Sequence, residues 1–286
     1  MRVLASLFFA AGVTVGARAA APAPPAAPPV ALTLATPTAG WRYEEQRRFP
    51  APEAGQGVVS DGEFLYAINN HTIAKYRATG GERLALWEGG NGGAIVHMNA
   101  GIVRDGRLYC AHSNYPGVPM LSSVEIFDTA TLKHVGSHSF GRSDGSLTWI
   151  DRRNDRWVAC FVHYGKRGGE PGRGPEWTQI VEFDDQWRRT GGWGLPPEFV
   201  AHIGPRGYSL SGGAIGPGGH LYATGHDHPE LYVLDFPSSG TVLTWTATLR
   251  IPTEGQAFGW DPKASGTLYN IGRKTREIIV GKVTAP

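Results

Sequence analysis

The chain has few of the features that assign a protein to a class at once. It holds only two cysteines among 286 residues, with no CxxC pair and no zinc-type spacing. Its formal net charge is +2 and its basic residues are scattered, so nothing in the charge favours nucleic acid or an anionic membrane as a partner. A phosphate-binding loop, a GxSxG elbow, an HExxH motif and a DxDxDG calcium loop are all absent from the sequence. These absences exclude the enzyme classes that those motifs identify.

Long apolar runs are also missing. The longest, Val3–Val15, is shorter than the roughly 20 residues that a spanning helix needs. It follows Arg2 and precedes an A-x-A pattern at Ala17–Ala19, which predicts a cleaved secretory signal over Met1–Ala19 and a periplasmic or secreted protein without a transmembrane segment. An uncleaved anchor is the alternative. Residues 20–40 are rich in Ala and Pro and are expected to be a flexible lead-in to a single domain over residues 41–286.

Export would permit a disulfide, and both cysteines, Cys110 and Cys160, fall in predicted inner strands. Two buried free thiols and one bridge therefore both remain open.

What the sequence does have is turns: 40 glycines and 21 prolines. Five segments share a small-residue start, a short apolar strand, a Gly, Asp or Asn turn, and a second strand that opens with an aromatic or aliphatic pair. They begin at Gly55, Met98, Ser146, Ser211 and Gly255. Asp-Gly and Gly-Gly turns supply the positive φ angles of tight hairpins, so each segment predicts a β-hairpin.

A third strand follows every hairpin, and a fourth follows the first four. The third strands are predicted at Ile73–Tyr76, Ser123–Phe127, Gln179–Phe183, Glu230–Leu234 and Glu277–Val283, and the fourth at Arg83–Trp87, His134–Phe140, Trp187–Trp193 and Thr244–Ile251. Equivalent positions are spaced by 43, 49, 64 and 44 residues, close to the period of a four-stranded propeller blade. The sequence thus predicts an all-β, five-bladed β-propeller, with the N-terminal strand Trp41–Arg48 completing the last blade and removing exposed sheet edges. An irregular β-sandwich is the alternative.

Polar residues gather where this fold would bring the strands together. In a propeller, innermost strands start and second strands end on the same face. The residues expected at these positions, and predicted to bind substrate, are Gln56, His97, Asn99, Asn114, Tyr115, Tyr164, Gln256 and Arg273.

Three histidines, His112, His163 and His226, occupy equivalent second-strand ends in different blades. Neutral imidazoles that converge could bind a divalent transition metal, and near-neutral ones could instead act as acid and base, so both roles stay open. Asp227 is placed to orient a histidine or act as a general base, and Arg273 to pair with a carboxylate or phosphate. The catalytic set predicted from the sequence is therefore His112, His163, His226 and Asp227.

Two long connections on this face, Tyr115–Ser122 and Tyr164–Trp177, could form a binding cleft or merely tolerate insertion. Tyr115, Tyr164 and Trp177 could stack on a sugar ring.

The first repeat, with Gly55-Gln56-Gly57 and Gly62-Glu63-Phe64-Leu65-Tyr66, resembles the first blade of bacterial glutaminyl cyclases, which are five-bladed. The regions Leu221–Leu234 and Gly255–Val283 resemble uncharacterised propellers described as cycloisomerases or lactonases. The acidic signatures of the cyclases are absent from the later repeats, so the resemblance implies the fold and assigns no catalytic residue.

Two functional hypotheses follow. The first is an exported monomeric enzyme of cyclase, lactonase or lyase type, acting on a small carboxylated or sugar-like substrate at the histidine-rich centre, with or without a divalent transition metal. The second is a non-catalytic module that binds a glycan or a protein at the same face.

Overall fold

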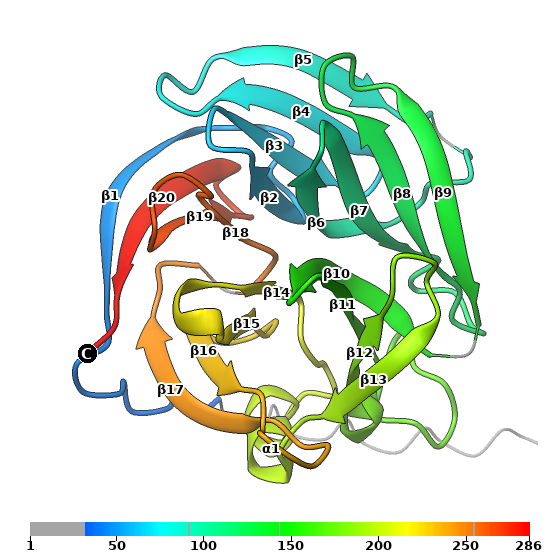
Figure 1. Ribbon diagram of the computed structural model, residues 1–286, viewed down its shortest axis with the longest axis vertical. Helices are drawn as coiled ribbons and strands as arrows, with labels where there is room; N and C mark the ends of the chain where they lie inside the picture. Colours follow the sequence, from blue (N-terminus) through cyan, green and yellow to red (C-terminus); the bar gives the residue numbers. More distant parts are fainter. Residues whose placement is uncertain (1–31, 91, 143, 254) are drawn as a thin grey trace, which may run out of the picture. The chain divides into compact units, whose positions relative to one another are not determined.

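Five four-stranded antiparallel sheets surround a common centre, so the chain is a five-bladed β-propeller (Figure 1). The computed structural model describes residues 32–90, 92–142, 144–253 and 255–286. The predicted signal Met1–Ala19 and the lead-in up to residue 31 lie outside these residues.

In the first four blades the strands follow chain order from the centre outward. Blade 1 holds β2 (Gly57–Ser60), β3 (Phe64–Asn69), β4 (Thr72–Arg77) and β5 (Arg83–Glu88). Blade 2 holds β6 (Met98–Arg104), β7 (Arg107–Ser113), β8 (Ser122–Asp128) and β9 (His134–Gly141). Blade 3 holds β10 (Ser146–Arg153), β11 (Arg156–Val162), β12 (Gln179–Phe183) and β13 (Arg189–Gly194). Blade 4 holds β14 (Gly212–Ile215), β15 (Leu221–Thr224), β16 (Glu230–Asp235) and β17 (Thr244–Arg250).

Blade 5 is built from both ends of the described chain. It holds β18 (Gly259–Trp260), β19 (Thr267–Gly272), β20 (Glu277–Thr284) and, outermost, β1 (Arg42–Pro50). The register pairs Tyr43 with Val283, and the Tyr43 ring lies over Gly281, where an added Cβ would come within 2.3 Å of it. The Tyr43 hydroxyl accepts a hydrogen bond from Asn270 Nδ2 at 3.0 Å. The predicted closing strand is therefore confirmed.

The core consists of five apolar clusters, four of them between two neighbouring blades. The fifth lies mainly between blades 3 and 4 and also includes Ala100 and Met120 of blade 2 and Ala257 of blade 5. Successive strand residues point to opposite sides of a sheet. Val58 therefore joins the cluster shared with blade 5, and Val59 the cluster shared with blade 2. Trp149, fully buried between blades 3 and 4, fits because Gly213 has no side chain. Because both sides of these strands are buried, the sequence of each repeat contains short, nearly continuous runs of apolar residues.

Several strands differ from their predicted bounds by one or two residues; β1, for example, spans Arg42–Pro50 instead of Trp41–Arg48. In two strands the backbone shows the reason. The outer strand of blade 3 begins at Arg189 instead of Trp187, because Trp187 closes the preceding turn with a φ of +60°. The inner strand of blade 5 contains just Gly259 and Trp260, because Gln256 leaves the strand conformation with a φ of +79°. The long spacing before blade 4 contains helix α1 (Pro197–Ile203), which the sequence did not predict.

The last part of the lead-in contacts blade 4. Thr38 N–H donates to the carbonyl of Thr248 on β17, and Thr248 N–H donates to the Thr38 hydroxyl. Residues 35–38 thereby cover the outer edge of this blade, which would otherwise present unpaired backbone groups.

Cys110 and Cys160 are both buried and free, and burial raises the pKa of each thiol. The free-thiol alternative holds in this structure. No helix among the described residues is long and apolar enough to cross a membrane.

Candidate functional site

The predicted site residues lie on one face of the ring because the strands are antiparallel. The start of each inner strand pairs with the end of the second strand, as Met98 does with His112 and Gly212 with Thr224. Polar residues at these starts and ends therefore come to the same rim.

A cavity of about 780 Å³ opens on this face between blades 4 and 5. Its lining includes His226 and Asp227 after β15, Gln256 before β18, and Arg273 and Arg276 after β19. Arg206 and Tyr208, from the segment between α1 and β14, complete the wall. We call this cavity the basic pocket, because its lining contains one described carboxylate, that of Asp227, and five basic residues: Arg48, Arg206, Arg273, Lys274 and Arg276.

One of the two ring nitrogens of His226 is engaged in a hydrogen bond. Its Nδ1 donates to the carbonyl of Ser209 at 3.0 Å, and its ring stacks on Tyr208 with centroids 5.1 Å apart. In the neutral ring this leaves Nε2 as an acceptor, and His226 is one of the residues that line the pocket. Burial lowers the pKa of His226, while the Ser209 carbonyl and Asp227 oppose that shift. The arrangement suits a general base.

Asp227 has a carboxylate oxygen that is buried and unmatched. The nearest cation is Arg206, whose Nε lies 3.6 Å from Oδ2, too far for a hydrogen bond. No described group donates to this oxygen.

Gln256 combines a strained backbone with an unmatched amide. Its φ of +79° is rare for a residue with a side chain. Three contacts hold it: the Thr224 hydroxyl donates to its carbonyl at 2.6 Å, Ala257 N–H donates to the Gln56 carbonyl, and Gly255 packs against the backbone of Gly225. The side chain is 4% exposed, and no described group donates to Oε1.

Arg273 connects the basic pocket to the rest of the rim. It is exposed, and together with His112 and His226 it disfavours a positive charge on His97. Burial is the larger cause, and the pKa of His97 falls to about 4. His97 is therefore neutral near pH 7 and cannot neutralise an anion there.

Aromatic rings link His97 to the basic pocket. Its ring lies 5.0 Å from that of Tyr115, which lies 5.3 Å from that of Tyr164, and Tyr164 meets the edge of His226 at 6.0 Å. Burial raises the pKa of Tyr164, so this wall is uncharged.

The other two predicted catalytic histidines have separate environments. His112 has both nitrogens occupied: Nε2 accepts from Val96 N–H at 3.0 Å, and Nδ1 donates to Ser123 at 2.8 Å. His163 is buried, with Nδ1 unpartnered among described groups, and burial lowers its pKa. His112, His163 and His226 do not come within 4.8 Å of one another by their ligand atoms. No contact of the described residues therefore supports a metal held by this set.

Three predicted amides are engaged in the fold. Gln56 donates to Asn70 at 2.7 Å and Asn99 to the Leu147 carbonyl at 3.3 Å. Asn114 ties its own loop through Pro119 and Leu121. The side-chain amides of Gln56, Asn99 and Asn114 thus stabilise the rim, whereas the amide oxygen of Gln256 has no donor among the described groups.

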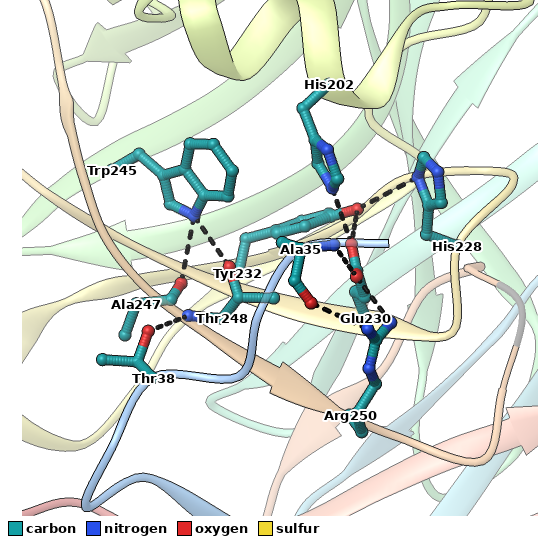
Figure 2. A network of polar contacts seen from close by, with 10 residues as sticks. All are labelled: Ala35, Thr38, His202, His228, Glu230, Tyr232, Trp245, Ala247, Thr248 and Arg250. Atoms are coloured by element: carbon teal, nitrogen blue, oxygen red, sulfur yellow. Dashed lines mark hydrogen bonds and ion pairs between the residues drawn. The ribbon is translucent and has the colours of Figure 1, made fainter. Parts of the chain in front are cut away.

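A second histidine cluster lies at blade 4, where His202 of α1 meets His228 and Glu230 (Figure 2). It is the one group of three such side chains in the described chain with ligand atoms within 4.8 Å. The fully buried carboxylate of Glu230 accepts four hydrogen bonds, one each from His202, Tyr232, Arg250 and Ala35 N–H.

This cluster is a hydrogen-bonded network in the present conformation. The rings of His202 and His228 stack at 4.7 Å with planes 11° apart. Because imidazole lone pairs lie in the ring plane, two such stacked rings cannot direct nitrogens at one ion. Arg250 also donates to the Ala35 carbonyl at 2.7 Å, so the network fastens the lead-in to blade 4 (Figure 2).

Sequence reasoning missed Arg206, Tyr208 and Arg276. The first two lie in the segment that lengthens the third repeat, and the 64-residue spacing was the signal that could have found them. Arg276 follows the predicted Arg273 on the same turn.

Comparison with known proteins shows the fold alone. No family model matches the chain, and no curated protein matches it significantly. The crystal structure of Myxococcus xanthus glutaminyl cyclase is 13% identical, with a TM-score of 0.55, over 86% of this chain and 98% of that one. A luciferin-regenerating enzyme is 13% identical, with a TM-score of 0.53, over 86% and 96%. The PQQ-bound aldose sugar dehydrogenase of Streptomyces coelicolor is 13% identical, with a TM-score of 0.51, over 87% and 100%. The resemblance to glutaminyl cyclase is thus confirmed for the fold.

Proposed function

We propose that this protein is an exported enzyme that binds a small carboxylated molecule in the basic pocket and uses His226 as a general base. One observation carries the proposal: His226, whose Nδ1 is hydrogen-bonded to the Ser209 carbonyl and whose pKa is lowered by burial, lines the same pocket as the guanidinium groups. Arginine forks match carboxylate geometry. The three similar structures are all named as enzymes, which makes an enzymatic propeller a reasonable class.

In this mechanism the carboxylate binds at Arg273. His226 Nε2 takes a proton from the substrate, and the Ser209 carbonyl stabilises the imidazolium through Nδ1–H. The negative charge of Asp227, the next residue in the chain, also favours the protonated form of His226. A base beside a bound carboxylate suits ring closure, ring opening or elimination, which are the cyclase, lactonase and lyase classes.

The proposal is tested first by binding. Propionate should bind the purified protein, as followed by NMR titration, and Arg273→Met should weaken binding about tenfold or more, since a charge-assisted pair is lost. Arg104→Met is the matched control, because Arg104 pairs with Asp105 in the β6–β7 turn. Equal affinity in Arg273→Met and wild type would refute the carboxylate site.

Catalysis is tested with His226→Asn. The Asn amide can replace Nδ1–H toward the Ser209 carbonyl, but it cannot act as the base. Assayed on a panel of small lactones and hydroxy acids, it should lose turnover by about 10²–10⁴-fold while binding of propionate is retained. Turnover unchanged in this variant would refute the role of His226.

A second candidate function is binding of a glycan or protein at the rim. Trp177 is 52% exposed on the long loop, near a cavity of about 700 Å³ lined by Val118, Glu170 and Arg173. If the rim is the site, Trp177→Ala should abolish binding on a glycan array. If the basic pocket is the site, this variant should bind propionate as the wild type does.

A further inference from the structure

The unmatched acceptors in the basic pocket restrict what the pocket can bind. Gln256 Oε1 and Asp227 Oδ2 are both buried, and neither receives a hydrogen bond from a described group. Asp227 Oδ2 has the longer ion pair with Arg206 Nε at 3.6 Å, whereas Gln256 Oε1 has no described partner. A buried acceptor left unpaired is costly, so native proteins pair nearly all of them. Both residues line the cavity that holds the arginines.

The backbone of Gln256 supports the same reading. A φ of +79° on a residue other than glycine persists only where its surroundings impose it, and such residues cluster at functional sites. Glycine would adopt this conformation without strain. The fold instead has Gly255 just before it, also at positive φ and packed on Gly225, and keeps an amide at the strained position.

We infer that Gln256 and Asp227 select, among small carboxylates, those that carry a hydroxyl or N–H donor close to the carboxylate. This inference rests on the proposed function, since Arg273 is taken to hold the carboxylate. The substrate's donor then pairs with Gln256 Oε1 or Asp227 Oδ2. An acid without such a donor leaves these acceptors unpaired, and this kind of mismatch is the one that protein sites reject most strongly.

The test compares lactate with propionate, which differ by one hydroxyl, in NMR titrations of the full chain. Wild type should bind lactate at least about tenfold more tightly. Gln256→Gly removes the amide and accepts the backbone angle without strain, so it should remain folded and lose much of this preference. Asp227→Asn, which replaces one acceptor oxygen by a donor, should weaken the preference as well.

The outcomes separate the two proposals. Equal binding of lactate and propionate to wild type, with both lost in Arg273→Met, overturns the selectivity and leaves the carboxylate site standing. An undiminished lactate preference in Gln256→Gly also overturns the role of Gln256. If neither acid binds wild type, the proposed function fails and the selectivity with it.

Discussion

Asp151 is a single residue whose environment makes stability depend on pH. One carboxyl oxygen accepts from Ile215 N–H across the interface of blades 3 and 4, at 2.7 Å, and the other from Arg152 N–H. The protein shields this carboxyl from water and raises its pKa to about 7 despite both hydrogen bonds. Its protonation therefore couples an inter-blade contact to pH near neutrality.

The sign of the effect follows from linkage. An unfolded aspartate titrates near 3.9, so between about pH 4 and pH 7 the unfolded state has released a proton that the folded state retains. Stability must then fall as pH rises through this window. In Asp151→Asn this contribution disappears, so urea unfolding at pH 4.5 and 7.5 should show a smaller loss than in wild type. The exposed Asp155, changed to Asn, serves as the control; an Asp151→Asn protein with the wild-type slope contradicts the assignment.

His97 makes stability depend on pH in the opposite direction to Asp151. With a folded pKa of about 4 against an unfolded value near 6.5, it remains neutral while the unfolded chain takes up a proton. Stability is thus lost as pH falls from about 6.5 toward 4. In an NMR titration its ring resonances should stay unchanged down to pH 5, with His97→Asn used for assignment.

Arg273→Gln should raise the pKa of His97, because one of the charges that lower it is removed. No change in this variant would show that the charge of Arg273 does not act on His97. Titration of His97 near 6.5 in wild type would show that its ring is not shielded from water.

At the scale of elements, the Glu230 network joins three segments: the lead-in through Ala35, α1 through His202, and β17 through Arg250. Glu230 is fully buried. Removing a buried carboxylate leaves its cationic partner without a counter-charge, which typically lowers the free energy of unfolding by about 3–5 kcal/mol. Glu230→Ala should lose about that much free energy of unfolding in urea. Glu88→Ala, at the exposed end of β5, should change it by less than about 0.5 kcal/mol. A loss for Glu230→Ala no larger than that control would mean that the network does not stabilise the fold.

Elements were predictable where local pattern determines them. The third strands and the first four hairpins carry turn residues and apolar runs that determine them locally, and β1 followed from the missing outer strand of the last repeat. The inner strand of the fifth hairpin is the exception, because tertiary contacts shorten it to Gly259 and Trp260. The site was predictable in position but less in composition. His112 and His226 were predicted to occupy equivalent places, but His112 lies within β7 and His226 two residues after β15. Val96 and Ser123 occupy both nitrogens of His112, and Ser209 occupies one nitrogen of His226. These hydrogen-bond partners belong to other strands and loops, so the sequence around each histidine does not predict them. The same holds for Gln256, whose left-handed backbone is imposed by Thr224 and Gly225.

At the scale of the whole molecule, β1 closes the ring. A chain that starts at Ala51 would lack β1, expose the edge of β20 and uncover the apolar clusters into which Trp41, Tyr43 and Phe49 pack. We expect it to aggregate on size-exclusion chromatography. A chain that starts at Leu32 keeps every contact described here and is the matched control. A monomeric, cooperatively melting chain from Ala51 would show that closure is dispensable.

The composite fifth blade also sets an order of events during biosynthesis. Arg42 pairs with Thr284, so the first strand to be made is among the last to find its partner. Blades 1 to 4 contain their own strands and can form as the chain emerges, while β1 has to wait for the final repeat. Until then the apolar face of β1 has no partner. The two ends of the domain must then meet, which is a slow step for a topology of such high contact order.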